Sequence, residues 1–260
     1  MAGERYSRAA MIALSLVCAL VWQQPGGAVA KPDAKPDAAA PSTTGTTPWD
    51  DKTAKAAVDE FAKVMKGTPS MLQKSRALDA LAAGSNPLLL KALAEVVEKD
   101  KSIVIRKRAA ELVAMQPEKD ANTTLRALLK NPRVNGTPQV CAQLVRSLAA
   151  CGYEAKQWAE VEGLFERDFA PECISLQEAV LDLAAKHKER AAIPLLLRNF
   201  GEPTPANVDA AHNPPKEYWE ARWKAWSAWK GKVKDTLFAI TGQRFNTAAE
   251  AEAWVKKNPQ

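Results

Sequence analysis

Apolar side chains recur every three or four residues along most of this chain, which is the period of an amphipathic helix. In the segment 51–66, for example, Val58, Phe61, Ala62 and Met65 stand at positions i, i+3, i+4 and i+7, so they share one helical face. No segment shows the strict apolar–polar alternation that is typical of a half-buried strand. The pattern therefore predicts an all-α fold.

Glycine and proline divide the rest of the chain into successive helices, because both residues favour turns and helix ends. After 51–66, the predicted helices cover 70–83, 87–99, 102–115, 118–130, 138–151, 154–167, 173–187 and 189–200. The Pro-rich segment 201–217 is predicted as a loop. It is followed by a Trp-rich helix from Tyr218 to about Gly231 and by a short helix that runs through Trp254.

The same eight-residue pattern recurs in four of these helices. The matching segments begin at Arg76, Arg108, Gln143 and Glu178, at spacings of 32, 35 and 35 residues. One column is always alanine and the column before it is leucine or valine. The alanines are Ala82, Ala114, Ala149 and Ala184, and their neighbours are Leu81, Val113, Leu148 and Leu183. A period in the thirties is typical of stacked helix pairs, in which small residues let neighbouring helices approach closely.

The repeat resembles a HEAT or armadillo-type repeat in its period, its paired helices and its small and large apolar columns. The resemblance covers roughly residues 70–200 and lacks the family's regular Asp and Arg at each turn within the repeat. A tetratricopeptide array is the nearest rival, but it requires Trp, Gly and Tyr at set positions that these segments lack. The closing pattern from Leu237 to Phe245, followed by Trp254, resembles that of secreted bacterial HEAT-like proteins.

This resemblance implies a short right-handed α-solenoid over 50–200, with an N-terminal helix and about four helix pairs. The segment 218–260 would then form a Trp-rich C-terminal cap. The resemblance implies no activity and no cofactor. It does imply a surface that binds an extended partner.

The first 30 residues are predicted to be a secretory signal peptide. Arg5 and Arg8 precede the apolar run 9–22, which is shorter than a membrane span, and Ala28 and Ala30 supply an A-x-A cleavage site. An uncleaved anchor is the alternative. The next segment, 31–49, has no large apolar side chain before its last residue, so we expect a disordered tether. These features predict an exported bacterial protein, periplasmic or secreted, without a stable membrane span after cleavage.

The net charge of +6 changes this picture little, because charges of both signs are interleaved along the chain. The one tight basic cluster, 106–108, points in three directions on a helix, so it forms no patch by itself. Nucleic-acid binding would require a one-sided basic stripe, and we expect no such partner.

Four tryptophans dominate the predicted C-terminal helix. Trp219, Trp223, Trp226 and Trp229 fall within an arc of roughly 120° and so form one stripe. The stripe has two interpretations. It is either a hydrophobic cap over the last repeat or an exposed aromatic platform for a peptide or glycan.

The chain after residue 30 contains Cys141, Cys151 and Cys173. Cys141 and Cys151 are about 15 Å apart on one helix, too far to bridge, whereas the repeat offset places Cys173 beside Cys141. We therefore expect any intrachain disulfide to be Cys141–Cys173. Three buried, reduced thiols are the alternative.

No catalytic, cofactor-binding or metal-ligating motif is found in the sequence, and the two histidines, His187 and His212, stand far apart. The leading hypothesis is therefore a non-enzymatic scaffold that binds a protein or peptide. The second is a cell-wall or glycan-binding module that uses the Trp stripe. The third is an enzyme with a site in the loop 201–215, which offers only Glu202, Asp209 and His212.

Overall fold

The computed structural model describes residues 46–205 and 213–258, and these are almost entirely helical. The all-α class predicted from the sequence is confirmed for this part of the chain. The predicted signal peptide over 1–30 and most of the predicted tether lie outside the described residues, and so do Asp209 and His212.

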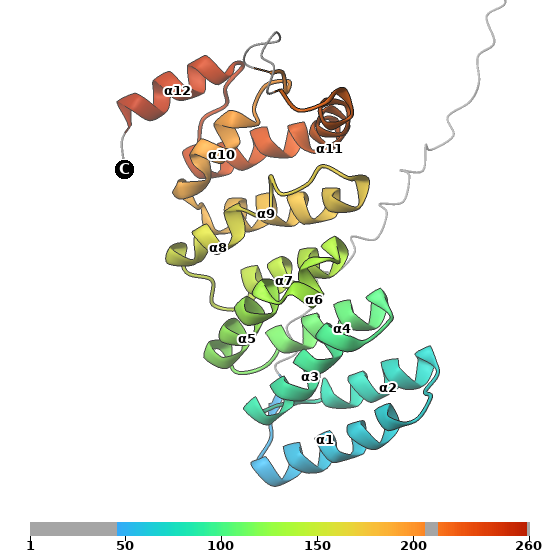
Figure 1. Cartoon of the computed structure of the whole chain (residues 1–260). Coiled ribbons are helices and arrows are strands. Elements are labelled where there is room, and N and C mark those ends of the chain that lie inside the picture. The colour runs from blue at the N-terminus through green and yellow to red at the C-terminus, as the bar shows by residue number, and fades with distance from the viewer. Residues whose placement is uncertain (1–45, 206–212, 259–260) are drawn as a thin grey trace, which may run out of the picture. The chain divides into compact units, whose positions relative to one another are not determined.

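The helices follow one another with short connections (Figure 1). The α-helices are α1 Asp51–Lys66, α2 Met71–Leu81, α3 Pro87–Lys99, α4 Ile103–Ala114, α5 Glu118–Lys130, α6 Pro132–Asn135, α7 Pro138–Ala150, α8 Trp158–Glu162, α9 Ile174–His187, α10 Ile193–Arg198, α11 Lys216–Thr241 and α12 Ala248–Lys257. Short 3-10 helices precede three of them: η1 Ala155–Gln157, η2 Pro171–Cys173 and η3 Arg190–Ala192.

Side-chain caps explain where several helices begin. The Asp50 carboxylate accepts a hydrogen bond from the Thr53 amide at the start of α1, and Ser70 and Gln73 form a reciprocal capping box at the start of α2. The Asn86 side chain caps α3, whose first residue is proline. These local signals are present in the sequence, and α1, α3 and α5 have the predicted bounds.

Successive layers of helices pack against one another in chain order. On one side α2 packs against α4, α4 against α7, α7 against α9, and α9 against α11; on the other, α1 packs against α3, and α3 against α5 (Figure 1). The repeated leucine or valine column lies inside these contacts, since each of its four side chains is at most 1 % exposed. The alanine column lies at the edge of the contacts: Ala149 and Ala184 are buried, whereas Ala82 and Ala114 are only partly buried.

The second helices of the later pairs are shorter than predicted. The predicted helix 154–167 is divided into η1 and α8 and ends at Glu162, and the predicted helix 189–200 is divided into η3 and α10. The short helix α6 was not predicted. Short helices are stabilised mainly by packing against neighbouring helices. Their ends therefore cannot be predicted from local periodicity and helix propensity alone.

The C-terminal helix is longer than predicted. α11 runs from Lys216 to Thr241 and passes straight through Gly231, where the sequence predicted its end, so the preceding loop ends at Pro215 rather than at 217. An interior glycine costs a helix only about 1 kcal/mol. Burial of Trp229, Val233 and Leu237 outweighs that cost.

The N-terminal residues of the described part are held against the loop between α2 and α3. Strand β1, Thr47–Pro48, pairs in parallel with β2, Gly84–Ser85, and the Trp49 amide donates a hydrogen bond of 3.1 Å to the Ser85 carbonyl. The Trp49 carbonyl accepts a bond from the Asn86 side chain. The predicted tether therefore ends before Thr46 rather than at Trp49.

The indole ring of Trp49 lies directly over Gly84. A Cβ atom at Gly84 would stand 2.0 Å from Cδ2 of the indole, far inside van der Waals contact, whereas a Cβ at Gly136 would meet nothing within 4 Å. We expect Gly84→Ala to lower the free energy of unfolding by about 1–3 kcal/mol, because the indole must leave its place. Urea denaturation measures this, with Gly136→Ala as the matched control. Equal effects of the two changes would contradict the packing described.

Glu160 joins α8 to α5 by ion pairs. Its carboxylate contacts the Arg126 guanidinium and lies 3.1 Å from the Lys130 ammonium. The hydrogen bond from Arg126, with a smaller contribution from Lys130, lowers the pKa of Glu160 to about 2.

The lowered pKa of Glu160 predicts a pH-dependent contribution to stability. Because the folded-state pKa lies below the ordinary value of about 4.3, the contribution is present above that pH and is lost as pH falls towards 2. We expect Glu160→Gln to lower the free energy of unfolding by about 1 kcal/mol at pH 7, a value discounted for the partial exposure of the ion pair. At pH 2 the substitution should have almost no effect. Thermal unfolding of both proteins from pH 7 to pH 2 checks this. A difference in stability between the two proteins that stays the same from pH 7 to pH 2 would contradict the proposed role of the ion pair.

Candidate functional site

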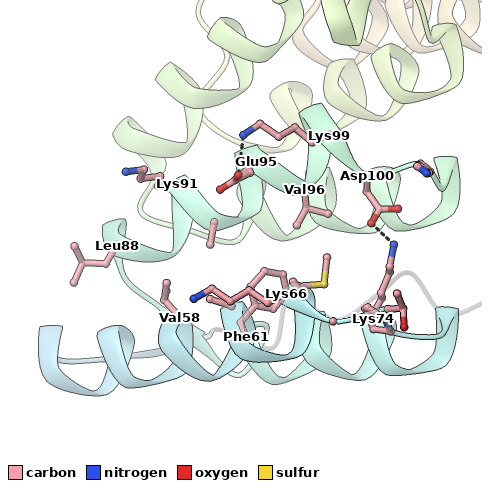
Figure 2. Close-up of a pocket in the computed structure, with 17 residues that line it drawn as sticks. Val58, Phe61, Lys66, Lys74, Leu88, Lys91, Glu95, Val96, Lys99 and Asp100 are labelled. Atoms are coloured by element: carbon pink, nitrogen blue, oxygen red, sulfur yellow. Dashed lines mark hydrogen bonds and ion pairs between the residues drawn. The ribbon is translucent and has the colours of Figure 1, made fainter.

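A groove of about 820 Å³ lies between α1 and α3 (Figure 2). Its floor is apolar and comes from both helices: Val58, Phe61, Ala62 and Met65 from α1, and Leu88, Ala92 and Val96 from α3. The turn Gly67–Pro69 lies at one end, next to Lys74 of α2. A groove that combines an apolar floor with polar groups at its edge is a common form of binding site.

The α1 side of this floor is the helical face that the sequence predicted. Phe61 is buried, and its three companions on that face are partly buried. The sequence analysis missed the α3 side. The signal was present in the run Leu88, Leu89 and Leu90, because three consecutive leucines point about 100° apart on a helix and cannot all face one core. Leu89 and Leu90 are buried, and Leu88 is 46 % exposed at the groove.

Lysines dominate the rim of the groove. Five of them line it, Lys66, Lys74, Lys91, Lys99 and Lys101, against the two carboxylates of Glu95 and Asp100. Both carboxylates are already paired: Asp100 lies 2.5 Å from the Lys74 ammonium, and Glu95 lies 2.8 Å from that of Lys99 (Figure 2). The hydrogen bond from Lys99 lowers the pKa of Glu95.

Three lysines of the rim therefore remain available to a ligand. Within the described residues, Lys66, Lys91 and Lys101 form no ion pair with an acidic side chain. The rim thus carries an excess of positive charge beside an apolar floor. Such a site favours a ligand that combines apolar groups with negative charge.

Exposed apolar side chains follow directly on the two loops at the end of the groove. Met71 and Leu72 open α2, and Ile103 and Val104 open α4; they are 51 %, 59 %, 41 % and 66 % exposed. The two helices pack against each other. Exposed apolar side chains at the starts of two packed helices are the kind of surface that interaction sites use.

The four tryptophans of the predicted stripe lie on one helix, α11, but they differ in burial. Trp229 is 1 % exposed, its indole N–H donates a 3.0 Å hydrogen bond to the Gln177 side chain, and its ring packs edge-on against Phe165. Trp223 at the other extreme is 46 % exposed, and its indole N–H donates to the Glu202 carboxylate. The stripe therefore straddles the border between the buried and the exposed side of α11.

The two remaining tryptophans of the stripe are partly buried, and cations of the same helix cover their rings. The Lys230 ammonium lies 4.6 Å from the ring centroid of Trp226, and the Arg222 guanidinium lies 5.7 Å from that of Trp219. A small hollow of about 290 Å³ lies between Trp219 and Trp223. The platform interpretation requires that Trp219, Trp223 and Trp226 be exposed, and of these Trp223 alone is.

The three cysteines of the described chain are buried and carry free thiols. The Cys141 thiol lies 3.4 Å from the Val134 carbonyl, and the Cys151 thiol lies 3.5 Å from that of Glu118, at the other end of α7. Burial raises the pKa of all three thiols, and the nearby carboxylates of Asp168 and Glu172 raise that of Cys173 further. The Cys141–Cys173 pairing stays a prediction.

The other chemically interesting residues lie apart from one another. The His187 ring donates a 2.9 Å hydrogen bond from Nε2 to the Ala149 carbonyl, and the Glu202 carboxylate accepts one from the Trp223 indole. Across the residues that the structure describes, no three His, Cys, Asp or Glu side chains converge as metal ligands would. In the same part of the chain, no helix combines the length and the apolar character needed to cross a membrane.

Comparison of the chain with protein-family models, with curated proteins and with solved structures finds no match.

The burial of the tryptophans predicts unequal effects of their removal. We expect Trp229→Ala to lower the free energy of unfolding by about 3–5 kcal/mol, because it leaves a cavity between α9 and α11 and removes the donor to the buried Gln177 Oε1. Trp223→Ala on the exposed side of the same helix is the control and should cost less than about 1 kcal/mol. Chemical denaturation followed by circular dichroism measures both. Similar losses of unfolding free energy in the two variants would contradict the difference in burial between Trp229 and Trp223.

Proposed function

We propose that this protein is an exported, non-enzymatic scaffold of HEAT-repeat type that binds another protein or a peptide. The described helices would form a short right-handed α-solenoid. The proposal is supported by the repeat period in the thirties, by the buried leucine or valine column that recurs in four helices, and by the chain-order packing of successive layers.

We also propose that the C-terminal segment caps this solenoid. α11 packs against α9 and α10, and α12 packs against α10, so these helices cover the apolar face of the last repeat. A terminal repeat without such a cover would leave its apolar face in water. The burial of Trp229 and Val233 supports this interpretation of the Trp-rich helix.

The groove between α1 and α3 is the observation that carries the binding function. Its apolar floor is continuous with a half-exposed leucine, and exposed apolar side chains follow at the starts of α2 and α4. Soluble monomers rarely leave contiguous apolar surface uncovered, because its burial is favourable by about 25 cal/mol per Å². The sequence features of residues 1–30 support export of the scaffold.

The glycan hypothesis gains no support of this kind. Burial of Trp229 and the cations over Trp219 and Trp226 leave one exposed tryptophan where a stacking platform would need several. We therefore keep it as an outcome of the test rather than as a second proposal.

The test is an affinity pull-down with residues 31–260 from the extracytoplasmic fraction of the host, with lysine-reactive cross-linking and mass spectrometry. We expect one enriched protein, cross-linked through Lys66, Lys91 or Lys101. The heat-unfolded protein on the same resin is the control for adhesive binding. Retention on isolated wall polysaccharide, with no enriched protein, would refute the scaffold and favour the glycan hypothesis.

A further inference from the structure

We infer that the groove between α1 and α3 binds an acidic amphipathic helix of the partner protein. This inference rests on the proposed scaffold function and specifies the chemistry of the partner. It follows from the shape of the groove, the composition of its floor and the charges on its rim.

The shape of the groove fits a helix. Its two walls are themselves helices, and the α3 wall runs from Leu88 to Lys99, which is about 16 Å or three helical turns. An amphipathic helix laid between two helices presents side chains at i, i+3 or i+4, and i+7 to such a groove. These apolar side chains would cover Val58, Ala62 and Leu88, which the protein leaves only partly buried or exposed.

The charges on the rim select an acidic partner. Figure 2 shows Lys91 on α3 at one side of the apolar floor and Lys66 of α1 extending across Phe61. Neither forms an ion pair with a described residue, whereas the two carboxylates of the rim are occupied by Lys74 and Lys99. Carboxylates that flank the apolar stripe of a bound helix would meet these lysines, and a basic helix would be repelled.

The segment before α1 does not provide such an occupant. Residues 31–48 contain no large apolar side chain, and their two lysines balance their two aspartates. A segment of this composition fills neither the apolar floor nor the positive rim. The occupant is therefore a segment of another protein.

The test uses a pair of synthetic helix-forming peptides of about 18 residues. Both carry leucine at i, i+3, i+4 and i+7; one has glutamate and the other lysine at the flanking positions. Each is labelled and titrated with the chain 31–260, and fluorescence anisotropy measures binding at low and at physiological salt. We expect the acidic peptide to bind at least about tenfold more tightly than the basic one, with an affinity that falls as salt rises.

Two groove variants and one control locate the binding. The double change Lys66→Glu and Lys91→Glu should weaken the acidic peptide about tenfold, and Ala92→Trp should abolish its binding by filling the floor. The control reverses two exposed lysines on other helices, Lys119→Glu and Lys256→Glu, and should leave affinity within about twofold. Should Ala92→Trp fail to fold by circular dichroism, Leu88→Asp replaces it, since Leu88 is half exposed.

Equal binding of the two peptides, or undiminished binding by the groove variants, would overturn the inference. The pull-down repeated with a groove variant separates this failure from failure of the scaffold function. A host protein captured by both the wild type and the groove variant would leave the scaffold intact and place its site elsewhere. Capture by the wild type alone supports both proposals.

Discussion

Burial of each helical layer against the next is the interaction on which the structure depends. A layer of two short helices has an apolar face that it cannot cover alone, and the neighbouring layer supplies the cover. The side chains at the centre of these contacts are fully buried in all four repeats: Leu78, Ala110, Val145 and Val180 stand one turn before the leucine or valine column, and none is exposed. Stability therefore depends on nearest neighbours along the chain.

Buried polar side chains then fix how the layers meet. The Asn122 and Gln157 side chains exchange hydrogen bonds between α5 and η1, and Asn122 also donates to the Gly152 carbonyl. Arg106 of α4 is also buried, and its guanidinium donates to the Val97 and Arg133 carbonyls and to the Thr137 hydroxyl. Burial lowers the pKa of Arg106, and these three acceptors offset the cost of desolvation.

The apolar side chains at the two ends of the described helices differ in how far they are covered. At the C-terminal end, α11 packs against α9 and buries Trp229 and Val233. At the N-terminal end, α1 packs against α2 and α3 but leaves the lysine-rimmed groove open. This asymmetry is why we place the binding function in the groove and not at the Trp-rich helix. In the proposed complex, the lysines beside the apolar floor would favour an acidic partner.

The sequence by itself determined the all-α class, the helices α1, α3 and α5 with their bounds, and the leucine or valine column that is buried between layers. These follow from local periodicity, capping residues and the repeat, all of which are properties of short segments. The tertiary structure alone decided that α11 continues through Gly231, that the Trp stripe is divided by burial, and that Leu88 and Lys91 face α1 across a groove. Each of these depends on which surface of a helix a distant neighbour covers. A helical period shows that residues share a face, but only packing decides whether that face meets protein or water.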